Sequence, residues 1–294
     1  MLTQQLLNAL VLGCLYSLYA LGLTLVFGVL EILNLAHASV YMSSAMLAVW
    51  MITGLKLPVA AALMLAVLAG GLIGVVVDRI AFAPFRRRGL SGQAMHMPSM
   101  ISSLALALLL EGANRGLFGI QVQRFPAGTF PDTVFPVGDA QISLLQLTVI
   151  AITITLIASS WWMLQRTRLG RAIRAVAENS RAAARMGIAV EAVVVKTFFL
   201  ASALGAISGI FMGLSFNSVH VLMGSTVELK GFAVIILAGM GSLPGAVVAS
   251  FILAISEVWA VAYVSSHFRD MIAFGLLIVV LLLRPQGLFG RLEN

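Results

Sequence analysis

Charged side chains are scarce in this sequence: they make up 10% of its 294 residues, whereas hydrophobic residues make up 61%. So much apolar surface exceeds what a soluble core can bury, which indicates a protein that spans lipid. There is one cysteine, Cys14, which excludes an intrachain disulfide and argues against a cysteine-based metal site. The few charged segments therefore indicate where the chain meets other molecules.

Several catalytic motifs are also missing. The sequence contains no GxxxxGK[ST] phosphate-binding loop and no HExxH, and no GxSxG stands with a convincing histidine partner. Any ATP must then be handled by another subunit, and an intramembrane hydrolase is poorly supported. We expect no catalytic residues, no metal and no cofactor in this chain.

Apolar runs fill the rest of the sequence and predict an all-α, polytopic membrane protein with eight or nine crossings in a single domain, residues 1–294. The seventh run is short for a full span, which favours a half-helix or a re-entrant segment. The first run should be an uncleaved membrane helix, because the N-terminus lacks the basic start and cleavage site of a signal peptide. The expected segments are 6–30, 38–54, 58–80, 99–119, 142–163, 193–216, 228–241, 245–264 and 269–284.

The basic residues predict the orientation in a bacterial inner membrane. Twelve of the 18 lie in three regions, at 79–88, 166–185 and 284–291, which fall on one side if the N-terminus is outside and the C-terminus is cytoplasmic. This topology accounts for the net charge of +7 better than nucleic-acid binding does. The proline- and glycine-containing loop at 120–141 would face outward, either as an ordered surface for a soluble partner or as a plain connection.

Six arginines lie within residues 166–185, between two membrane-length runs. Ile173, Val176 and Ala177 recur at helical spacing among them, and Gly187 follows, which predicts one short amphipathic helix that ends at glycine. A helix of this kind in a cytoplasmic loop, at about 164–192, is suited to docking. The positive-inside rule alone would also require some of these arginines.

Two polar breaks interrupt the apolar pattern at comparable points of the two halves, at 31–37 (EILNLAH) and 239–245 (GMGSLPG). Such breaks are typical of a duplicated transporter fold in which non-helical backbone lines a solute path, and tight cytoplasmic turns would give the same pattern. The residues expected near the path are Asn34, His37, Ser39, Gly241, Ser242, Pro244 and Gly245.

Ionisable residues within apolar runs are also functional candidates. Glu111 and Arg115 are spaced i, i+4 and can form an ion pair, which either holds helices together or gates the path. Glu257 lies toward the end of the eighth run, and the sequence names no partner for it.

Four stretches resemble the LivH-type permeases of branched-chain amino acid ABC importers. The resemblance covers nearly the whole chain, with the motifs in family order, although Leu35 stands where the family's asparagine-phenylalanine-alanine-histidine motif has phenylalanine. The matching stretches are FGVLEILNLAHASVYMSSA (27–45), GRAIRAVAENSRAAARMGI (170–188), GFAVIILAGMGSLPGAVVASFILAISE (231–257) and RPQGLFG (284–290).

This resemblance implies a permease subunit that pairs with a LivM-type second permease, two cytoplasmic ABC ATPases and a periplasmic solute-binding protein. It implies that Gly170, Arg171, Arg174, Asn179 and Gly187 belong to the loop that docks on an ATPase. The same family includes permeases for urea, amides and aromatic acids, so the solute stays open. Because the apolar segments hold few charges to clamp an amino acid, we expect the binding protein to carry most of the selectivity.

Two other classes remain as alternatives. A stand-alone secondary transporter needs an ion-coupling carboxylate near the bilayer midplane, whereas Glu31, Glu111 and Glu257 all lie nearer the ends of their runs. An intramembrane enzyme needs a catalytic constellation, and none is recognisable in the sequence. Co-purification with ATPases would separate a permease subunit from both.

Overall fold

The computed structural model describes residues 2–88, 93–263, 265, 267, 269–284 and 286–289, and most of them are helical. The helices are α1 (Leu2–Leu30), α2 (His37–Thr53), α3 (Val59–Val77), the π-helical turn η1 (Asp78–Phe82), α4 (Ala83–Arg87), α5 (Gln93–Phe118), α6 (Leu144–Arg166), α7 (Arg168–Glu178), α8 (Ser180–Arg185), α9 (Val190–Phe216), α10 (Met223–Ala238), α11 (Leu243–Tyr263) and α12 (Arg269–Leu283). Two strands, β1 (Val134–Val137) and β2 (Ala140–Ser143), complete the fold.

Nine apolar helices occupy the places of the nine expected segments. Six of them are long and apolar enough to cross a bilayer by themselves: Leu2–Leu30, Val59–Arg87, Ala94–Phe118, Leu144–Arg166, Val190–Phe216 and Leu243–Tyr263. The other three, α2, α10 and α12, have 17, 16 and 15 residues. A helix satisfies its own backbone hydrogen bonds, which is why apolar runs in lipid adopt this form.

The core of the molecule is built on α1, α2, α9 and α10, and small residues let their backbones approach closely. A Cβ at Gly22 of α1 would lie 2.4 Å from the carbonyl oxygen of Ala201 in α9. A Cβ at Gly209 of α9 would lie 2.3 Å from the carbonyl oxygen of Tyr41 in α2. Close approach through glycine is the usual packing device between membrane helices, where no hydrophobic effect drives association.

The peripheral helices α3, α5 and α6 keep broad apolar faces exposed, as lipid-facing or subunit-facing helices do. The exposed side chains of these helices include Met64 (69%), Leu72 (60%), Met97 (68%), Ile101 (65%), Leu108 (62%) and Trp162 (63%).

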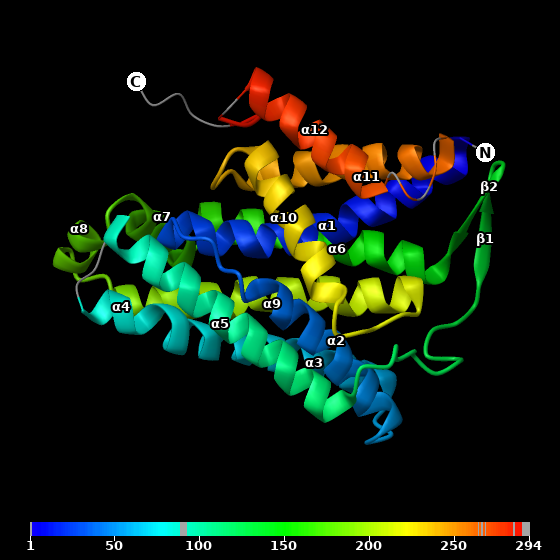
Figure 1. Ribbon diagram of the computed structural model, residues 1–294, viewed down its shortest axis with the longest axis horizontal. Coiled ribbons are helices and arrows are strands. Elements are labelled where there is room, and N and C mark those ends of the chain that lie inside the picture. Colours follow the sequence, from blue (N-terminus) through cyan, green and yellow to red (C-terminus); the bar gives the residue numbers. More distant parts are fainter. Residues whose placement is uncertain are drawn as a thin grey trace.

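The two ends of the molecule differ. The N-terminus and the β-hairpin lie at one end and α7 with α8 at the other, while α10 crosses the long helices at a steep angle (Figure 1). Gln4 holds the hairpin to α1, because the backbone N–H of Gln141 donates to its Oε1 at 2.8 Å.

The hairpin corrects the expectation of a purely helical chain. Val134 pairs with Ser143 and Val137 with Ala140, and Gly138 makes the turn with a φ of +60°, which glycine adopts without steric cost. Part of the expected outer loop is therefore ordered by strand pairing.

Candidate functional site

The loop at 166–190 forms two short helices instead of one. Asn179 has an extended backbone, and its Oδ1 accepts a hydrogen bond from the N–H of Ala182 at 2.9 Å, so it ends α7 and caps α8. Gly187 follows α8 with a φ of +84°, the left-handed conformation that glycine favours. The expectation of one helix ending at glycine was wrong at Asn179, because a capping side chain interrupts the helix there.

Tight packing fixes the start of α7 against the end of α6. Thr167 Oγ1 accepts a hydrogen bond from the N–H of Gly170 at 3.1 Å, which caps the new helix. A Cβ at Gly170 would lie 2.3 Å from the carbonyl oxygen of Met163, so no larger residue fits without a backbone shift. The sharp turn from α6 into α7 therefore depends on glycine at this position.

The two faces of α7 are distinct. Ile173 and Val176 are buried, at 5% and 3% exposure, against neighbouring helices of the same chain. Arg171 and Arg174 are exposed, and Arg174 also donates to the carbonyl oxygen of Leu164 near the end of α6. The amphipathic pattern expected from the sequence is thus present, with its apolar stripe covered and its basic face open.

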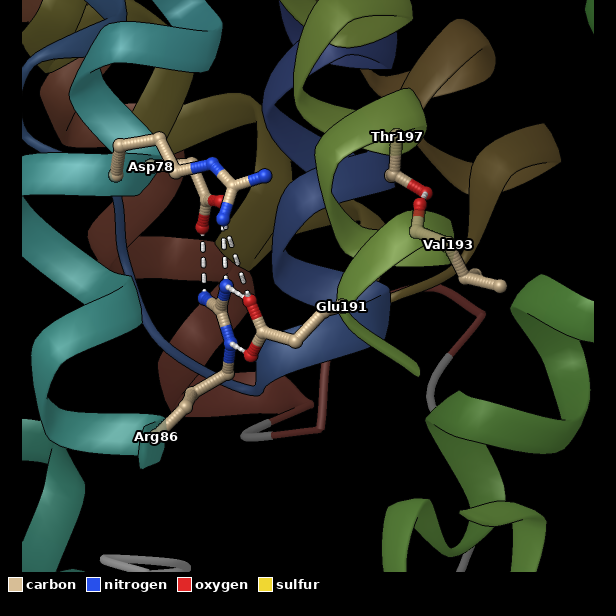
Figure 2. A network of polar contacts seen from close by, with 6 residues as sticks. Asp78, Arg86, Glu191, Val193 and Thr197 are labelled. Carbon is tan, nitrogen blue, oxygen red and sulfur yellow. Dashed lines mark hydrogen bonds and ion pairs between the residues drawn. The ribbon is translucent and has the colours of Figure 1, made fainter. Parts of the chain in front are cut away.

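A network that the sequence did not reveal lies beside this loop. The Arg86 guanidinium of α4 lies between the carboxylates of Asp78 in η1 and Glu191 in α9 (Figure 2). Arg86 Nη1 donates to Asp78 Oδ1 at 2.7 Å, and Arg86 Nε donates to Glu191 Oε1 at 3.1 Å. Each carboxylate also accepts from Arg86 Nη2, at 3.2 and 3.3 Å. We call Asp78, Arg86 and Glu191 the arginine clamp.

Local structure explains how the clamp assembles. The N–H of Ala83 bonds the carbonyl of Asp78 in a π-type turn, a departure from regular helix that is frequent at functional sites. Phe82 on the same turn packs against Phe198 of α9, with ring centroids 5.3 Å apart. Glu191 lies on the first turn of α9, so the clamp fastens the chain that leaves α8 to the end of α3.

A groove of about 540 Å³ runs between the clamp and the two short helices. Its lining residues include Leu30, Glu31, Arg86, Ala177, Asn179, Ser180, Ala184 and Glu191. The exposed basic face, the groove and the clamp therefore form one continuous region at this end of the molecule.

The first polar break supports its own backbone. Asn34 is 2% exposed, and its Oδ1 accepts a hydrogen bond from the N–H of Ala36 at 3.1 Å. The N–H of Leu35 donates to Ser103 Oγ of α5 at 3.4 Å, and Ser39 Oγ donates to the carbonyl oxygen of Ala107 at 3.2 Å. Asn34 therefore satisfies a backbone group that the break leaves free.

His37 is wholly buried at the start of α2. A Cβ at Gly22 or at Gly205 would lie 2.9 Å from its ring, so two glycines make the slot that accepts the imidazole. The ring of Tyr19 lies against it with a centroid separation of 5.0 Å. This histidine is a packing element between α1, α2 and α9.

The second break is a turn closed by the C-terminal segment. Ser242 Oγ accepts from the N–H of Gly245 at 3.2 Å, and Gly241 has a φ of +87°. The N–H of Leu288 donates to the carbonyl oxygen of Leu237 at 2.8 Å, which satisfies a carbonyl left open at the end of α10. Pro244 borders an apolar cavity of about 310 Å³ between α1, α6 and α11. The backbone at Leu288 and Phe289 thus caps α10.

Glu111 and Arg115 form the ion pair that their spacing indicates. Arg115 Nη2 lies 2.5 Å from Glu111 Oε1, and the two side chains are 26% and 49% exposed. Both belong to α5, so this pair does not join two helices.

The strongest polar feature of the interior was missed by sequence reasoning. Lys230 of α10 and Glu257 of α11 are 6% and 1% exposed at their side chains, and Lys230 Nζ lies 2.6 Å from Glu257 Oε1. Tyr16 of α1 donates to Glu257 Oε2 at 2.8 Å, and Arg269 of α12 pairs with Glu257 Oε1. Asp270 Oδ1 lies 3.1 Å from Lys230 Nζ. We call these five residues the lysine cluster.

One signal could have found this cluster. Lys230 lies within an apolar membrane run, 228–241, where a lysine is costly unless it is paired. Glu257 lies in the following run, without a sequence neighbour of opposite charge. Pairing each orphan charge with the other would have predicted the contact.

Similarity to known proteins identifies the family of this chain. The family described as branched-chain amino acid transport system, permease component, matches residues 5–281. The chain belongs to this family. The permease is 30% identical to the high-affinity branched-chain amino acid transport system permease protein BraD of Pseudomonas aeruginosa, over 99% of this chain and 96% of that protein. It is also 30% identical to LivH of Escherichia coli K12, with the same coverage, and 25% identical to a probable LivH of Methanocaldococcus jannaschii over 96% of this chain.

These relatives confirm the LivH-type resemblance and the class of protein. The chain is the permease component of an ABC importer and a multi-pass protein of the inner membrane, which implies ATPase and binding-protein partners. The relatives are named as transport permeases and not as enzymes.

Proposed function

We propose that this permease forms half of the pathway for a branched-chain amino acid or a related small solute, together with a LivM-type second permease. Two cytoplasmic ABC ATPases would drive it, and a periplasmic binding protein would deliver the solute. The observation that carries the proposal is the construction of α7: a helix with a buried apolar stripe and exposed arginines, held at both ends by caps, in a chain that matches importer permeases over its full length.

The coupling residues then divide into two groups. Gly170, Asn179 and Gly187 give the loop its shape, while Arg171 and Arg174 present charge to an ATPase. Arginine suits this role because its planar fork can pair with a carboxylate in a fixed orientation. The arginine clamp would pass movement of the docked loop to α3 and α9 as a rigid-body shift.

The proposed orientation places α7 and α8 in the cytoplasm and the β-hairpin outside. Two observations support it: basic residues at 79–88 and 166–185 flank the α7 end, and the hairpin end has few of them. We propose nine crossings, with α2, α10 and α12 as short or tilted spans inside the assembly. The N-terminus would lie outside and the C-terminus in the cytoplasm, with residues 1–294 as one domain.

Both polar breaks would lie beside the solute pathway, because the helices that they connect would border it. The residues involved are Asn34, His37, Ser39, Gly241, Ser242, Pro244 and Gly245. Their side chains mainly hold backbone and packing in place, so we propose a positioning role for them: they set how α1 meets α2 and how α10 meets α11.

The docking claim is tested by reversing one exposed charge. Arg171→Glu should reduce co-purification of the ATPase subunits with the permease at least several-fold, because it sets like charges against an acidic partner surface. Arg124→Glu, at an exposed arginine of the opposite end, is the matched control and should leave the complex intact. Normal assembly and coupled transport in Arg171→Glu would refute docking through this face.

The orientation is tested with single cysteines in a Cys14→Ser background. In intact cells, an impermeant thiol reagent should label Asp132→Cys and should label Arg185→Cys only after the membrane is opened. Labelling of Arg185→Cys from outside would reverse the topology.

A further inference from the structure

The lysine cluster lies between two cavities. One, of about 440 Å³, extends toward the hairpin end, where Asn8 and Gln146 line it, and it also reaches Glu257. The other is smaller, about 170 Å³, and is lined by Tyr16 and Lys230. Phe216 and Arg269 line both cavities, so the cluster and these two side chains form the wall between them.

The smaller cavity is built to take a ligand with one polar end and one apolar end. Met212, Phe216 and Met223 supply apolar lining, while Lys230 and Arg269 bring two cations to the same space. A cavity of roughly 150 Å³ with an apolar lining accepts a molecule the size of benzene, so about 170 Å³ suits a small aliphatic solute.

An unsatisfied hydroxyl gives a second, independent sign of a ligand. Tyr41 lines this cavity and is wholly buried, and its hydroxyl has no hydrogen-bond partner within the described part of the chain. Buried polar groups are nearly always paired, so an orphan at a cavity wall points to a partner that arrives from outside the chain.

The balance of charge selects the ligand class. Lys230 and Arg269 carry two positive charges, and Glu257 and Asp270 carry two negative ones. A lone anion or cation that entered would leave one buried charge uncompensated, which is costly. A zwitterion brings one charge of each sign, so it can exchange partners with the cluster without leaving a net charge behind.

We propose that the lysine cluster is the recognition site for the headgroup of a zwitterionic aliphatic amino acid in the translocation pathway. The solute carboxylate binds Lys230 and Arg269, its ammonium binds Glu257, and Tyr41 donates a hydrogen bond. The cluster opens as the solute passes from the larger cavity into the smaller one. This site rests on the proposed function. It gives this chain a part in solute selectivity, whereas the sequence led us to expect most of the selectivity in the binding protein.

A structural latch is the rival explanation, and a charge swap separates the two. When Lys230→Glu, Glu257→Lys, Arg269→Glu and Asp270→Lys are combined, every ion pair of the cluster and its net charge are kept, so a latch would still close. A headgroup site would present the wrong sign to each end of the solute. We expect uptake to fall at least about 100-fold while ATPase subunits still co-purify.

The assay uses the complete transporter in vesicles, with radiolabelled L-leucine and L-valine delivered by its binding protein. The wild-type complex must first take up these amino acids. If it does not, both the proposed solute class and the site are rejected. Near-normal uptake by the swapped complex, with wild-type uptake intact, would overturn the site alone.

Tyr41→Phe decides the matter if the swapped chain does not assemble. It removes a hydroxyl that has no hydrogen-bond partner among the described residues, so stability should hold, whereas KM for L-leucine should rise roughly 3- to 10-fold. Tyr19→Phe is the control, because the Tyr19 hydroxyl is equally buried and without a partner among the described residues but lies outside the cavity lining. Equal KM values for both variants and the wild type would contradict the proposal.

Discussion

The arginine clamp and the lysine cluster both hold a cation between carboxylates from different helices, yet they are built in different ways. In the clamp, one planar guanidinium meets Asp78 and Glu191 along two sides, with four donor contacts in fixed directions. In the cluster, the Lys230 ammonium contacts Tyr16, Glu257 and Asp270, and a second cation, Arg269, also pairs with Glu257, beside two cavities.

This difference indicates different mechanical roles. An arginine fork is pre-organised for bidentate pairing, so the clamp can behave as a rigid fastener between the coupling loop and the membrane helices. A lysine is a point charge with rotatable donors on a flexible stem, so its partners can be exchanged at small geometric cost. We expect the clamp to stay closed through the transport cycle and the cluster to open.

The largest effect should come from leaving charges unpaired in the cluster. Glu257→Leu leaves the buried Lys230 with the exposed Asp270 and removes the carboxylate that Arg269 pairs with, so it should destabilise the permease by about 3 kcal/mol, the lower end of the cost of removing one member of a buried pair. Thermal unfolding of the purified complex measures this. Lys230→Met/Glu257→Leu, which removes both charges, should recover much of the stability but not the uptake; recovered uptake would mean that the pair is only a latch.

The next effect should come from the geometry of the clamp. Arg86→Lys keeps the charge but cannot reach Asp78 and Glu191 with two contacts each, which should cost roughly 1.5–3 kcal/mol. If the clamp transmits force, ATP hydrolysis should continue while uptake per ATP falls. Arg87→Lys, at the neighbouring arginine, is the control, and an unchanged uptake-to-hydrolysis ratio in Arg86→Lys would remove the clamp from the coupling mechanism.

A smaller effect is expected at the cap between α7 and α8. Asn179→Ala removes the acceptor for the Ala182 N–H and should destabilise the start of α8 by about 1 kcal/mol, seen as faster amide exchange at residues 180–185. Asn179→Ser keeps an acceptor and should exchange near the wild-type rate. Equal exchange in both variants would show that the clamp alone holds this segment.

The smallest effect should appear at the exposed pair on α5. Glu111→Gln breaks a contact whose side chains are 26% and 49% exposed, so stability should change by less than about 1 kcal/mol and uptake should stay near normal. A loss of uptake of more than tenfold, measured in the same vesicles, would instead give this pair the gating role that its position allows.

Much of the fold could be predicted along the chain because it depends on local patterns. The nine apolar runs became nine helices, and Ile173 and Val176 lie on the buried face of α7 as their spacing indicated. The hairpin and the division at Asn179 were missed, because both depend on how a few polar groups find backbone partners.

By itself, the sequence determined that this protein lives in lipid, where its helices lie along the chain, and which loop carries the basic amphipathic helix. Hydropathy and helical periodicity act over a few residues and need no knowledge of the fold. Only the tertiary structure decided which charges meet: Tyr16 and Glu257 are 241 positions apart, and Arg86 and Glu191 are 105 apart. Such contacts depend on how the helices pack. The glycines that allow close approach contact residues of other helices, which a local sequence pattern does not identify.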